Sequence, residues 1–383
     1  MNPLNPIFAI IIYCIAFVTA YFIQLKYKIS NDNTRNENID ALRGFLALGV
    51  FICHASVWHQ YLQIGSWEIP KSNLYTHLGQ TSVAFFFMIT AFLFVSKLLN
   101  ANKKGINWKA LFISRFFRLT PMYLVSIAVV TLIVLVISDW QLKSGAVSFA
   151  KDLFYWSSFT IFFFFNINEN EFTSIINAGV IWSLPYEWLF YFSLPLMALL
   201  MLKKKPSIYY ILISLVFVIV YFRINGFEGQ HLVSFMGGAI TPFILKYGNK
   251  KINYNRAFVS VVVVICLGLI LQFETSSDWI CKILIVVVFN LIALGNTIFG
   301  ILKSTILKFL GEICYSTYLI HGIVLFVVLY FGFGLKPAAQ LSPLAYCLTV
   351  FAITPFVVIL SFITYRIIEK PCMDFSKKIR LTR

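Results

Sequence analysis

Residues 40–58 read DALRGFLALGVFICHASVW, an apolar run with an arginine near its start and a histidine deep inside it. From Gly44 onward the run is long enough for a helix to cross a bilayer, which takes about 20 apolar residues. A helix is the expected spanning structure because it satisfies its own backbone hydrogen bonds in lipid. The stretch therefore predicts a transmembrane helix that carries two ionisable side chains.

The composition extends this prediction to the whole chain. Of its 383 residues, 60% are hydrophobic and only 12% are charged, whereas a soluble domain has about 25% charged residues. The formal charge of +16 comes mostly from short loops between apolar blocks, which favours the positive-inside bias of membrane proteins over nucleic-acid binding. The seven cysteines fall mostly inside apolar blocks without a CxxC pair, so we expect neither a disulfide framework nor a metal site.

The apolar blocks predict an all-α polytopic protein with about eleven spans. Basic loops place the N-terminus outside and the C-terminus in the cytoplasm, and positive charge after the first block indicates a retained helix rather than a signal peptide. Residues 152–165 are apolar but short, so we predict a re-entrant or interfacial segment there. The spans are residues 7–23, 44–62, 78–98, 119–137, 184–202, 208–222, 232–245, 258–273, 279–299, 309–331 and 344–368.

Ionisable residues inside spans are candidates for function, because lipid-facing helices have no use for them. Arg43 and His54 lie eleven positions apart, about three helical turns and roughly 16 Å along one face. With Arg43 at the cytoplasmic edge, His54 falls near the middle of the bilayer. A histidine there can act as a general base for a hydroxyl, or it can simply bond a neighbouring helix.

Four further ionisable residues lie in or beside a predicted span. Arg115 and Arg118 share a helix face and could grip phosphate oxygens in a bidentate way, or could be ordinary cytoplasmic anchors. Glu187 is predicted towards the outer side of His54, where it could orient a histidine or bind a sugar, with Trp182 as an apolar platform. His321 accompanies Tyr315 and other polar residues, which favours a contact between helices.

The last predicted helix carries Arg366 and Glu369 near its inner end, a spacing that favours a structural ion pair. Pro371 is expected to stop this helix. The sequence holds no P-loop, HExxH or GxSxG motif, so it gives no basis for ATP hydrolysis, zinc chemistry or a serine-hydrolase triad.

Six short motifs, from about Ile39 to Pro371, together resemble the acyltransferase-3 family of membrane O-acyltransferases, which includes bacterial O-antigen and exopolysaccharide acetylases. IDALRG followed by His54 looks like the family's Arg-x10-His signature. The others are FFFMITAFLF (85–94), SRFFRLTP (114–121), WSLPYEWLFY (182–191), GEICYSTYLIH (311–321) and YRIIEKP (365–371).

The chain departs from the family pattern in two ways. Thr90 and Ala91 stand where the family usually has Ser-Gly, and the first helix is additional to a core of about ten spans. We also expect no appended SGNH-type hydrolase domain. The predicted organisation is an additional helix and loop at 1–38, the acyltransferase-like domain at 39–375 and a basic tail at 376–383.

The resemblance implies an O-acyltransferase of the bacterial cytoplasmic membrane, with acetyl-CoA or another acyl-CoA as donor, no metal, and a hydroxyl of a cell-surface or lipid-linked glycan as acceptor. Arg43, Arg115 and Arg118 would bind the donor. His54 would deprotonate the acceptor or help to form an acyl-enzyme, with Glu187 orienting the reaction. Substrate contacts are expected from Trp182, Ser183, Tyr315 and His321.

A proton-coupled transporter or flippase for a polar or lipid-linked substrate is the alternative. In that case His54, Glu187 and His321 would relay protons or bind the transported substrate. Such proteins are often built from paired half-repeats with interrupted helices, and no repeat is visible in the order of the motifs. A purely structural membrane subunit is a third possibility, disfavoured by three ionisable residues within spans. Both alternatives predict no specific binding of acyl-CoA.

Overall fold

The computed structural model describes residues 2–27, 36–101, 105–226, 229–248 and 252–381, and every regular element in these ranges is a helix. The predicted all-α class is therefore confirmed. Parts of the predicted cytoplasmic segments, at 28–35, 102–104, 249–251 and 382–383, lie outside the described residues.

The α-helices are α1 (Pro6–Lys26), α2 (Glu37–Ile64), α3 (Asn73–Asn100), α4 (Trp108–Ile137), α5 (Gly145–Ser157), α6 (Thr173–Ile176), α7 (Leu184–Met201), α8 (Ile208–Asn225), α9 (Gly229–Tyr247), α10 (Ala257–Ile270), α11 (Trp279–Ala293), α12 (Thr305–Glu312), α13 (Cys314–Phe326), α14 (Leu335–Ala339), α15 (Pro343–Thr364) and α16 (Lys370–Leu381).

Shorter or wider helical segments join some of these elements. Three are 3₁₀ turns, η1 (Ile167–Glu169), η2 (Val180–Ser183) and η3 (Ile301–Lys303). Two are π-helices, η4 (Val327–Phe333) and η5 (Tyr365–Glu369), which continue α13 and α15. Such π-segments are rare and often lie near functional sites.

Eight helical stretches of the described residues are long and apolar enough to cross a membrane. Each contains or overlaps one predicted span. The other three predicted spans correspond to α9, which is not among the eight, and to the apolar helices α10 and α11, which have only 14 and 15 residues. The eight are Pro6–Lys26, Glu37–Ile64, Asn73–Asn100, Trp108–Ile137, Val180–Met201, Ile208–Asn225, Cys314–Phe333 and Pro343–Ile379.

α2, which contains residues 40–58, is the central helix. Of its most apolar window 83% is buried, against 28% for α1, and it packs against α3, α12 and α13. A Cβ on Gly311 of α12 would lie only 1.8 Å from the Asp40 carbonyl oxygen, and one on Gly44 only 2.4 Å from that of Leu307. Only glycine permits these backbones to approach so closely, and the crossing brings Arg43 beside the start of α13.

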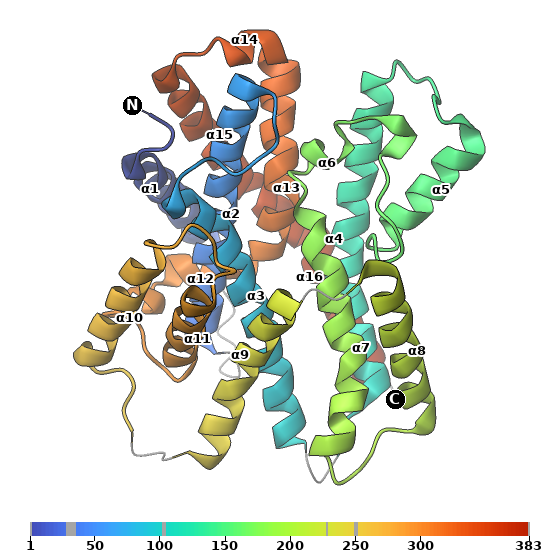
Figure 1. The fold of residues 1–383 in the computed structure, drawn as a ribbon, viewed down its shortest axis with the longest axis vertical. Coiled ribbons are helices and arrows are strands. Elements are labelled where there is room, and N and C mark those ends of the chain that lie inside the picture. Colours follow the sequence, from blue (N-terminus) through green and yellow to red (C-terminus); the bar gives the residue numbers. More distant parts are fainter. Residues whose placement is uncertain (1, 28–35, 102–104, 227–228, 249–251, 382–383) are drawn as a thin grey trace.

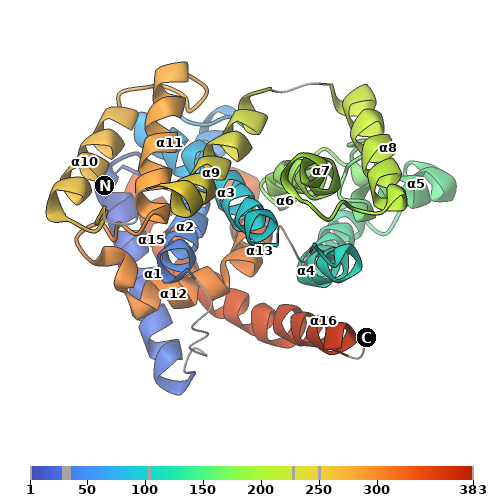
Figure 2. The same cartoon turned by 90° about the horizontal axis from the view of Figure 1, so that it is seen from below.

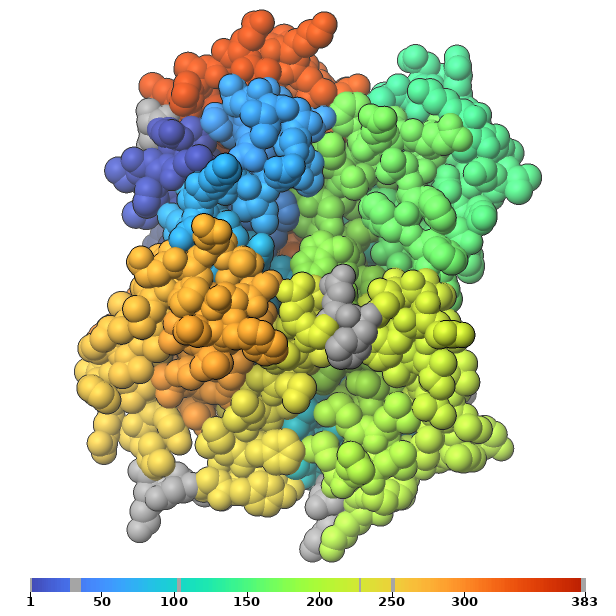
Figure 3. All heavy atoms as spheres, in the orientation of Figure 1, coloured from blue at the N-terminus to red at the C-terminus, as the bar shows by residue number. Residues whose placement is uncertain are grey.

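The helices form two groups that meet around α3, α4, α7 and α13 (Figure 1). One group contains α4–α8, and the other contains α1–α3, α9–α13 and α15. On the face in Figure 3, α9–α11 cover much of α2 and α3, leaving a strip of α3 visible beside α7. From below, α13 lies between α2 and α4, and α16 runs along one side of the bundle against α4 (Figure 2).

The chain between α4 and α7 does not form a span, as predicted for residues 152–165. Those residues form the end of α5, which has 13 residues, and an irregular segment after it. The chain then passes through α6 and η2 into the bundle, where Asn177, Val180 and Ile181 are buried. As a result α7 begins about halfway along α4 (Figure 1), which places Glu187 of its first turn in the interior.

The ends of the helices agree with the predicted alternation of spans. α3, α7 and α9 end, and α4 and α8 begin, at the same end of the bundle (Figure 1). This end carries lysines predicted to be cytoplasmic, and one of them, Lys246, donates a hydrogen bond to the Leu99 carbonyl at 2.7 Å.

Two details of the C-terminal third differ from the prediction. The expected span 309–331 is divided at Ile313 into α12 and α13, and α11 ends at Ala293 rather than near residue 299. Pro371 does not stop the last helix: α15, η5 and α16 follow one another without a break, and Pro371 lies inside this stretch, directly after the π-helix η5. A proline in a helix interior removes an α-helical hydrogen bond, and the π geometry just before it already departs from that pattern.

The predicted ion pair between Arg366 and Glu369 is also absent from the described residues. Arg366 instead lies over the Tyr27 ring, 4.2 Å from its centroid. Glu369 is buried and accepts a hydrogen bond from Ser316 of α13. The π-helical geometry of η5 breaks the α-helical spacing on which the prediction relied.

Candidate active site

Two adjoining pockets lie where the two groups of helices meet. The inner pocket is lined by α2, α3, α4, η2, α7 and α13 and has a volume of about 780 Å³, including the space at its open end. The entrance pocket, of about 840 Å³, is lined mainly by the N-terminal part of α2, by α4, α12 and η5, and by Met373 of α16. Arg43, Arg115 and Arg118 line both pockets.

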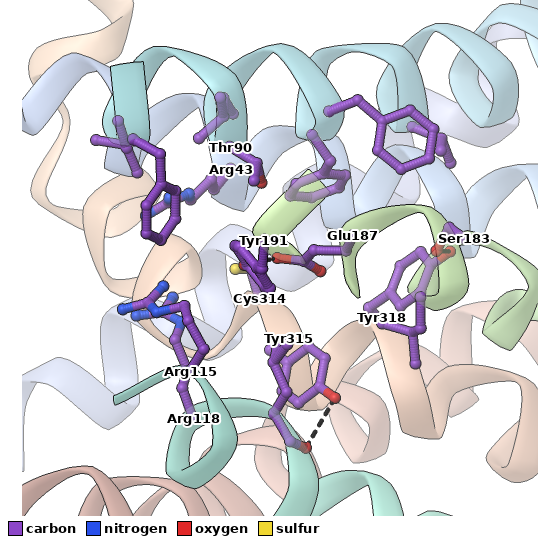
Figure 4. Close-up of a pocket in the computed structure, with 18 residues that line it drawn as sticks. Arg43, Thr90, Arg115, Arg118, Ser183, Glu187, Tyr191, Cys314, Tyr315 and Tyr318 are labelled. Carbon is purple, nitrogen blue, oxygen red and sulfur yellow. Dashed lines mark hydrogen bonds between the residues drawn. The ribbon is translucent and has the colours of Figure 1, made fainter. Parts of the chain in front are cut away.

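These three arginines form the boundary between the pockets and lie together on one side of the inner pocket (Figure 4). Arg43 forms an ion pair with Asp40 at 3.0 Å. In the part of the chain that the structure describes, neither Arg115 nor Arg118 forms an ion pair with a carboxylate. Two guanidinium groups therefore face the pockets, and an anion there would offset the cost of holding charge inside a membrane.

Glu187 lies on the opposite side of Tyr191 from the arginines and is the one carboxylate among the described residues lining the inner pocket. The Tyr191 hydroxyl donates a hydrogen bond to Glu187, and Tyr191 and Arg115 both line the pocket. Glu187 and Tyr191 are four residues apart on α7, so they share a helix face. Tyr191 thus lies between Glu187 and the arginines (Figure 4).

The far end of the inner pocket is closed by a second pair of polar side chains, Ser183 and Tyr318 (Figure 4). Their hydroxyl oxygens are 2.8 Å apart, and the Tyr318 hydroxyl also donates to the Val180 carbonyl at 2.8 Å. Ser183 immediately precedes α7, so this contact ties the interior start of α7 to α13.

Tyr315 lines the pocket one turn before Tyr318 on α13. Its hydroxyl donates to the Leu119 carbonyl of α4 at 2.9 Å, while the neighbouring Ser316 bonds with Glu369 of η5. These two contacts fix α13 between α4 and η5, so both pockets depend on the position of α13.

His54 and His321 form a pair just beyond the end of the inner pocket. His54 Nδ1 is 3.0 Å from His321 Nε2, and the two rings stack with centroids 5.1 Å apart. His321 lies one helical turn after Tyr318, whose ring centroid is 6.4 Å from its own. Neither histidine lines either pocket, and Tyr318 lies between the pocket and the pair.

Trp182 lies outside the inner pocket and is 43% exposed. Its ring packs near Tyr186, His231 and Phe87, with the His231 ring centroid at 5.0 Å. Phe87 itself lines the inner pocket, so a single aromatic side chain separates Trp182 from the pocket.

Of the nine predicted site residues, the structure therefore brings six to the inner pocket: Arg43, Arg115, Arg118, Ser183, Glu187 and Tyr315. His54 and His321 adjoin its far end as a pair, and Trp182 lies outside it. The prediction missed Asp40, Tyr191 and Tyr318. The i, i+4 spacing of Tyr191 from Glu187 was a usable signal, but nothing local indicated that Tyr318 would meet Ser183.

The chemistry of this arrangement suits an anionic ligand that enters by way of the arginines and reaches the polar groups deeper in the bundle. Guanidinium groups match phosphate oxygens well. Among the described residues no three His, Cys, Asp or Glu side chains lie close enough together to hold a metal ion.

The fold and pockets define a polytopic integral membrane protein with a buried, cationic ligand site. Comparison with known families identifies it further: the family described as acyltransferase domain, acyltransferase-3, matches residues 36–366. The chain therefore belongs to the acyltransferase-3 family. The match begins after α1, and it covers every residue of both pockets except Glu369 and Met373.

The similar curated proteins include two from Staphylococcus aureus, strains COL and MSSA476, each named "Putative O-acetyltransferase". Each is 26% identical over 365 residues, which covers 87% of this chain and 56% of the relative. The chain thus spans about half the length of these relatives. No solved structure matches the chain.

Proposed function

We propose that the protein is an O-acyltransferase that moves an acyl group, acetyl in the simplest case, from acyl-CoA to a hydroxyl of a cell-surface or lipid-linked glycan. The observation that carries the proposal is the position of Arg115 and Arg118. Neither forms an ion pair with a carboxylate among the described residues. Both line the entrance pocket, together with Glu369, and the inner pocket, together with Glu187.

The donor would occupy both pockets. Its phosphates bind Arg115 and Arg118 through charge-assisted hydrogen bonds, with the nucleotide in the entrance pocket. The narrow pantetheine arm then extends into the inner pocket past Tyr191 and Glu187 and brings the thioester towards Tyr318. Because Arg43 is already paired with Asp40, it contributes less to binding than the other two arginines.

His54 would accept the proton of the acceptor hydroxyl as that oxygen attacks the thioester carbon. The new C–O bond forms, the C–S bond breaks, and CoA leaves as a thiolate that takes up a proton. Tyr318 lies between the inner pocket and the histidine pair. For the thioester to meet the hydroxyl, either Tyr318 moves aside or the acceptor reaches the thioester from the side away from the entrance pocket. Glu187 orients the donor through its contact with Tyr191.

The acceptor would approach from the side opposite the entrance pocket, where Trp182 is exposed and can stack on a sugar ring. We propose that the protein resides in the bacterial cytoplasmic membrane with the C-terminus and the entrance pocket in the cytoplasm. The cytoplasmic supply of acyl-CoA and the lysines near this end support that orientation.

The first test is binding of acetyl-CoA by the detergent-purified protein, measured by isothermal titration beside an Arg115→Ala/Arg118→Ala double variant. The wild type should bind, and the double variant should lose roughly 100-fold in affinity or more, since each hydrogen bond to a charged group contributes about 1.5–3 kcal/mol.

A matched control removes the same charge elsewhere: Arg223→Ala/Arg256→Ala, two exposed arginines outside both pockets. This variant should bind like the wild type. Equal binding by all three proteins would place the donor elsewhere, and no binding by a folded wild type would refute the acyl-CoA proposal.

A further inference from the structure

We propose that His321 is a positioning residue that sets which nitrogen of His54 carries a proton, and so makes His54 Nε2 the base of the reaction. The proposal rests on the proposed function and assigns His321 a role other than substrate contact. Its basis is a chain of two hydrogen bonds, from His54 to His321 and from His321 to the backbone of α13.

The protonation of His321 follows from its backbone contact. His321 Nδ1 lies 2.8 Å from the Thr317 carbonyl oxygen. A carbonyl oxygen only accepts hydrogen bonds, so Nδ1 must carry the hydrogen. In the neutral imidazole Nε2 then has a lone pair, and it is this atom that faces His54.

The protonation of His54 follows in turn. His54 Nδ1 is 3.0 Å from His321 Nε2, and because His321 Nε2 is an acceptor, His54 Nδ1 must donate. Neutral His54 therefore keeps its lone pair on Nε2, the nitrogen on the far side of the ring from His321.

The pair is held in place by close packing on both sides. His321 and Thr317 are almost completely buried, at 0% and 2% exposed, and the Phe51 ring contacts His321 at 6.1 Å between centroids. A Cβ on Gly322 would lie 2.4 Å from the Asn177 carbonyl carbon, so α13 rests directly on the segment before η2. His321 therefore cannot turn away without moving a helix.

This arrangement also serves the step in which His54 takes up the proton. The resulting imidazolium has hydrogens on both nitrogens, and its Nδ1–H remains bonded to His321 Nε2. Hydrogen bonds to charged groups are stronger than those between neutral groups. In other catalytic sites a hydrogen-bonding partner holds the general base in one tautomer. His321 has this role for His54.

The tautomer can be measured directly by nitrogen NMR of the purified protein labelled with ¹⁵N-histidine, with His54→Gln and His321→Gln used to assign the two signals among five histidines. At neutral pH both residues should carry hydrogen on Nδ1 and a lone pair on Nε2. A hydrogen on Nε2 of either neutral histidine would overturn the proposal, whatever the activity of the protein.

The rate provides an independent readout, with water as the smallest hydroxyl acceptor and release of CoA thiol from acetyl-CoA as the signal. His321→Leu should lower the turnover rate roughly 10- to 100-fold and leave the affinity for acetyl-CoA within about twofold. His321→Gln, whose amide oxygen can accept from His54, should recover most of the loss. His59→Leu, the same replacement elsewhere on α2, should behave like the wild type.

The outcomes separate the two proposals. Wild-type turnover by folded His321→Leu, or a rate for His321→Gln as low as that for His321→Leu, would overturn the positioning role while leaving acyl transfer intact. No binding and no turnover by the wild type would refute the proposed function, and the NMR measurement would still decide the tautomer.

Discussion

Replacing Gly311 by alanine should destabilise the protein by moving α12 away from α2. The added Cβ would lie 1.8 Å from the Asp40 carbonyl oxygen, whereas ordinary contact begins at 3.4 Å, so the two backbones must separate by about 1.6 Å. Overpacking typically costs about 1–3 kcal/mol, and the contact here is backbone on backbone, which favours the upper end. Alanine has a higher helix propensity than glycine, which offsets about 1 kcal/mol of this cost. The free energy of unfolding should therefore fall by roughly 2 kcal/mol.

The assay compares the thermal unfolding midpoints of Gly311→Ala and Gly268→Ala in the same detergent. Gly268 lies in α10 with no atom within 4 Å of an added Cβ, so its replacement should leave the midpoint unchanged or raise it. Gly311→Ala should lower the midpoint by a few degrees. Since Gly311 also lines the entrance pocket, moving α12 should also weaken acetyl-CoA binding.

Midpoints that shift by the same amount and sign in the two variants would refute the reasoning. The effect would then come from the general properties of glycine in a helix and not from the α2–α12 crossing. A lower midpoint for Gly311→Ala with unchanged acetyl-CoA binding would support the crossing and disprove its link to the entrance pocket.

Three further predictions concern the site and the orientation. Glu187→Gln should slow acyl transfer roughly tenfold or more while binding acetyl-CoA at least as tightly, because it removes a negative charge near the arginines; unchanged turnover would contradict this. Asp40→Asn should free Arg43 and tighten acetyl-CoA binding roughly two- to fivefold, as measured by titration, and weaker binding would disprove it. A periplasmic phosphatase reporter joined after Arg383 should be inactive in intact cells, and an active one would reverse the proposed orientation.

The parts of the fold that could be predicted are those that the lipid environment determines. A span needs length and low polarity, so the helices that contain residues 7–23 and 44–62 were found from composition alone. Residues 152–165 were correctly excluded, since they are too short and their flanks would have reversed the charge bias. Burial of backbone polar groups in lipid leaves few alternatives to a helix.

The errors lie where contacts between helices override local signals. Pro371 would end an isolated helix, but here it follows the π-helix η5 inside a continuous helical stretch, where the α-helical hydrogen-bond pattern is already interrupted. The division at Ile313 separates α12, which crosses α2, from α13, which reaches the pocket. Neither feature follows from apolar patterning, because both depend on a partner that is distant in sequence.

The same distinction applies to the site. His54 could be placed beside the pocket because its spacing from Arg43 lies within one helix, and the helix converts spacing into position. Its pairing with His321 depends on how α13 rests on the segment before η2, and no periodicity within either helix encodes that contact. The sequence thus singled out both histidines, because each lies within a predicted span, and could not show that they act together.

The charges of the site explain why its occupied and empty states should differ in stability. Arg43 has Asp40, and Glu187 has Tyr191. Arg115 donates to the Ser114 hydroxyl at 3.4 Å and lies over the Phe94 ring at 5.1 Å from its centroid, and no carboxylate among the described residues forms an ion pair with it. A guanidinium group held away from bulk water costs free energy that an anion can offset. A bound donor phosphate would supply that anion and stabilise the folded protein in proportion to its occupancy. The arginines that weaken the empty bundle are therefore the ones that we expect to bind the donor most strongly.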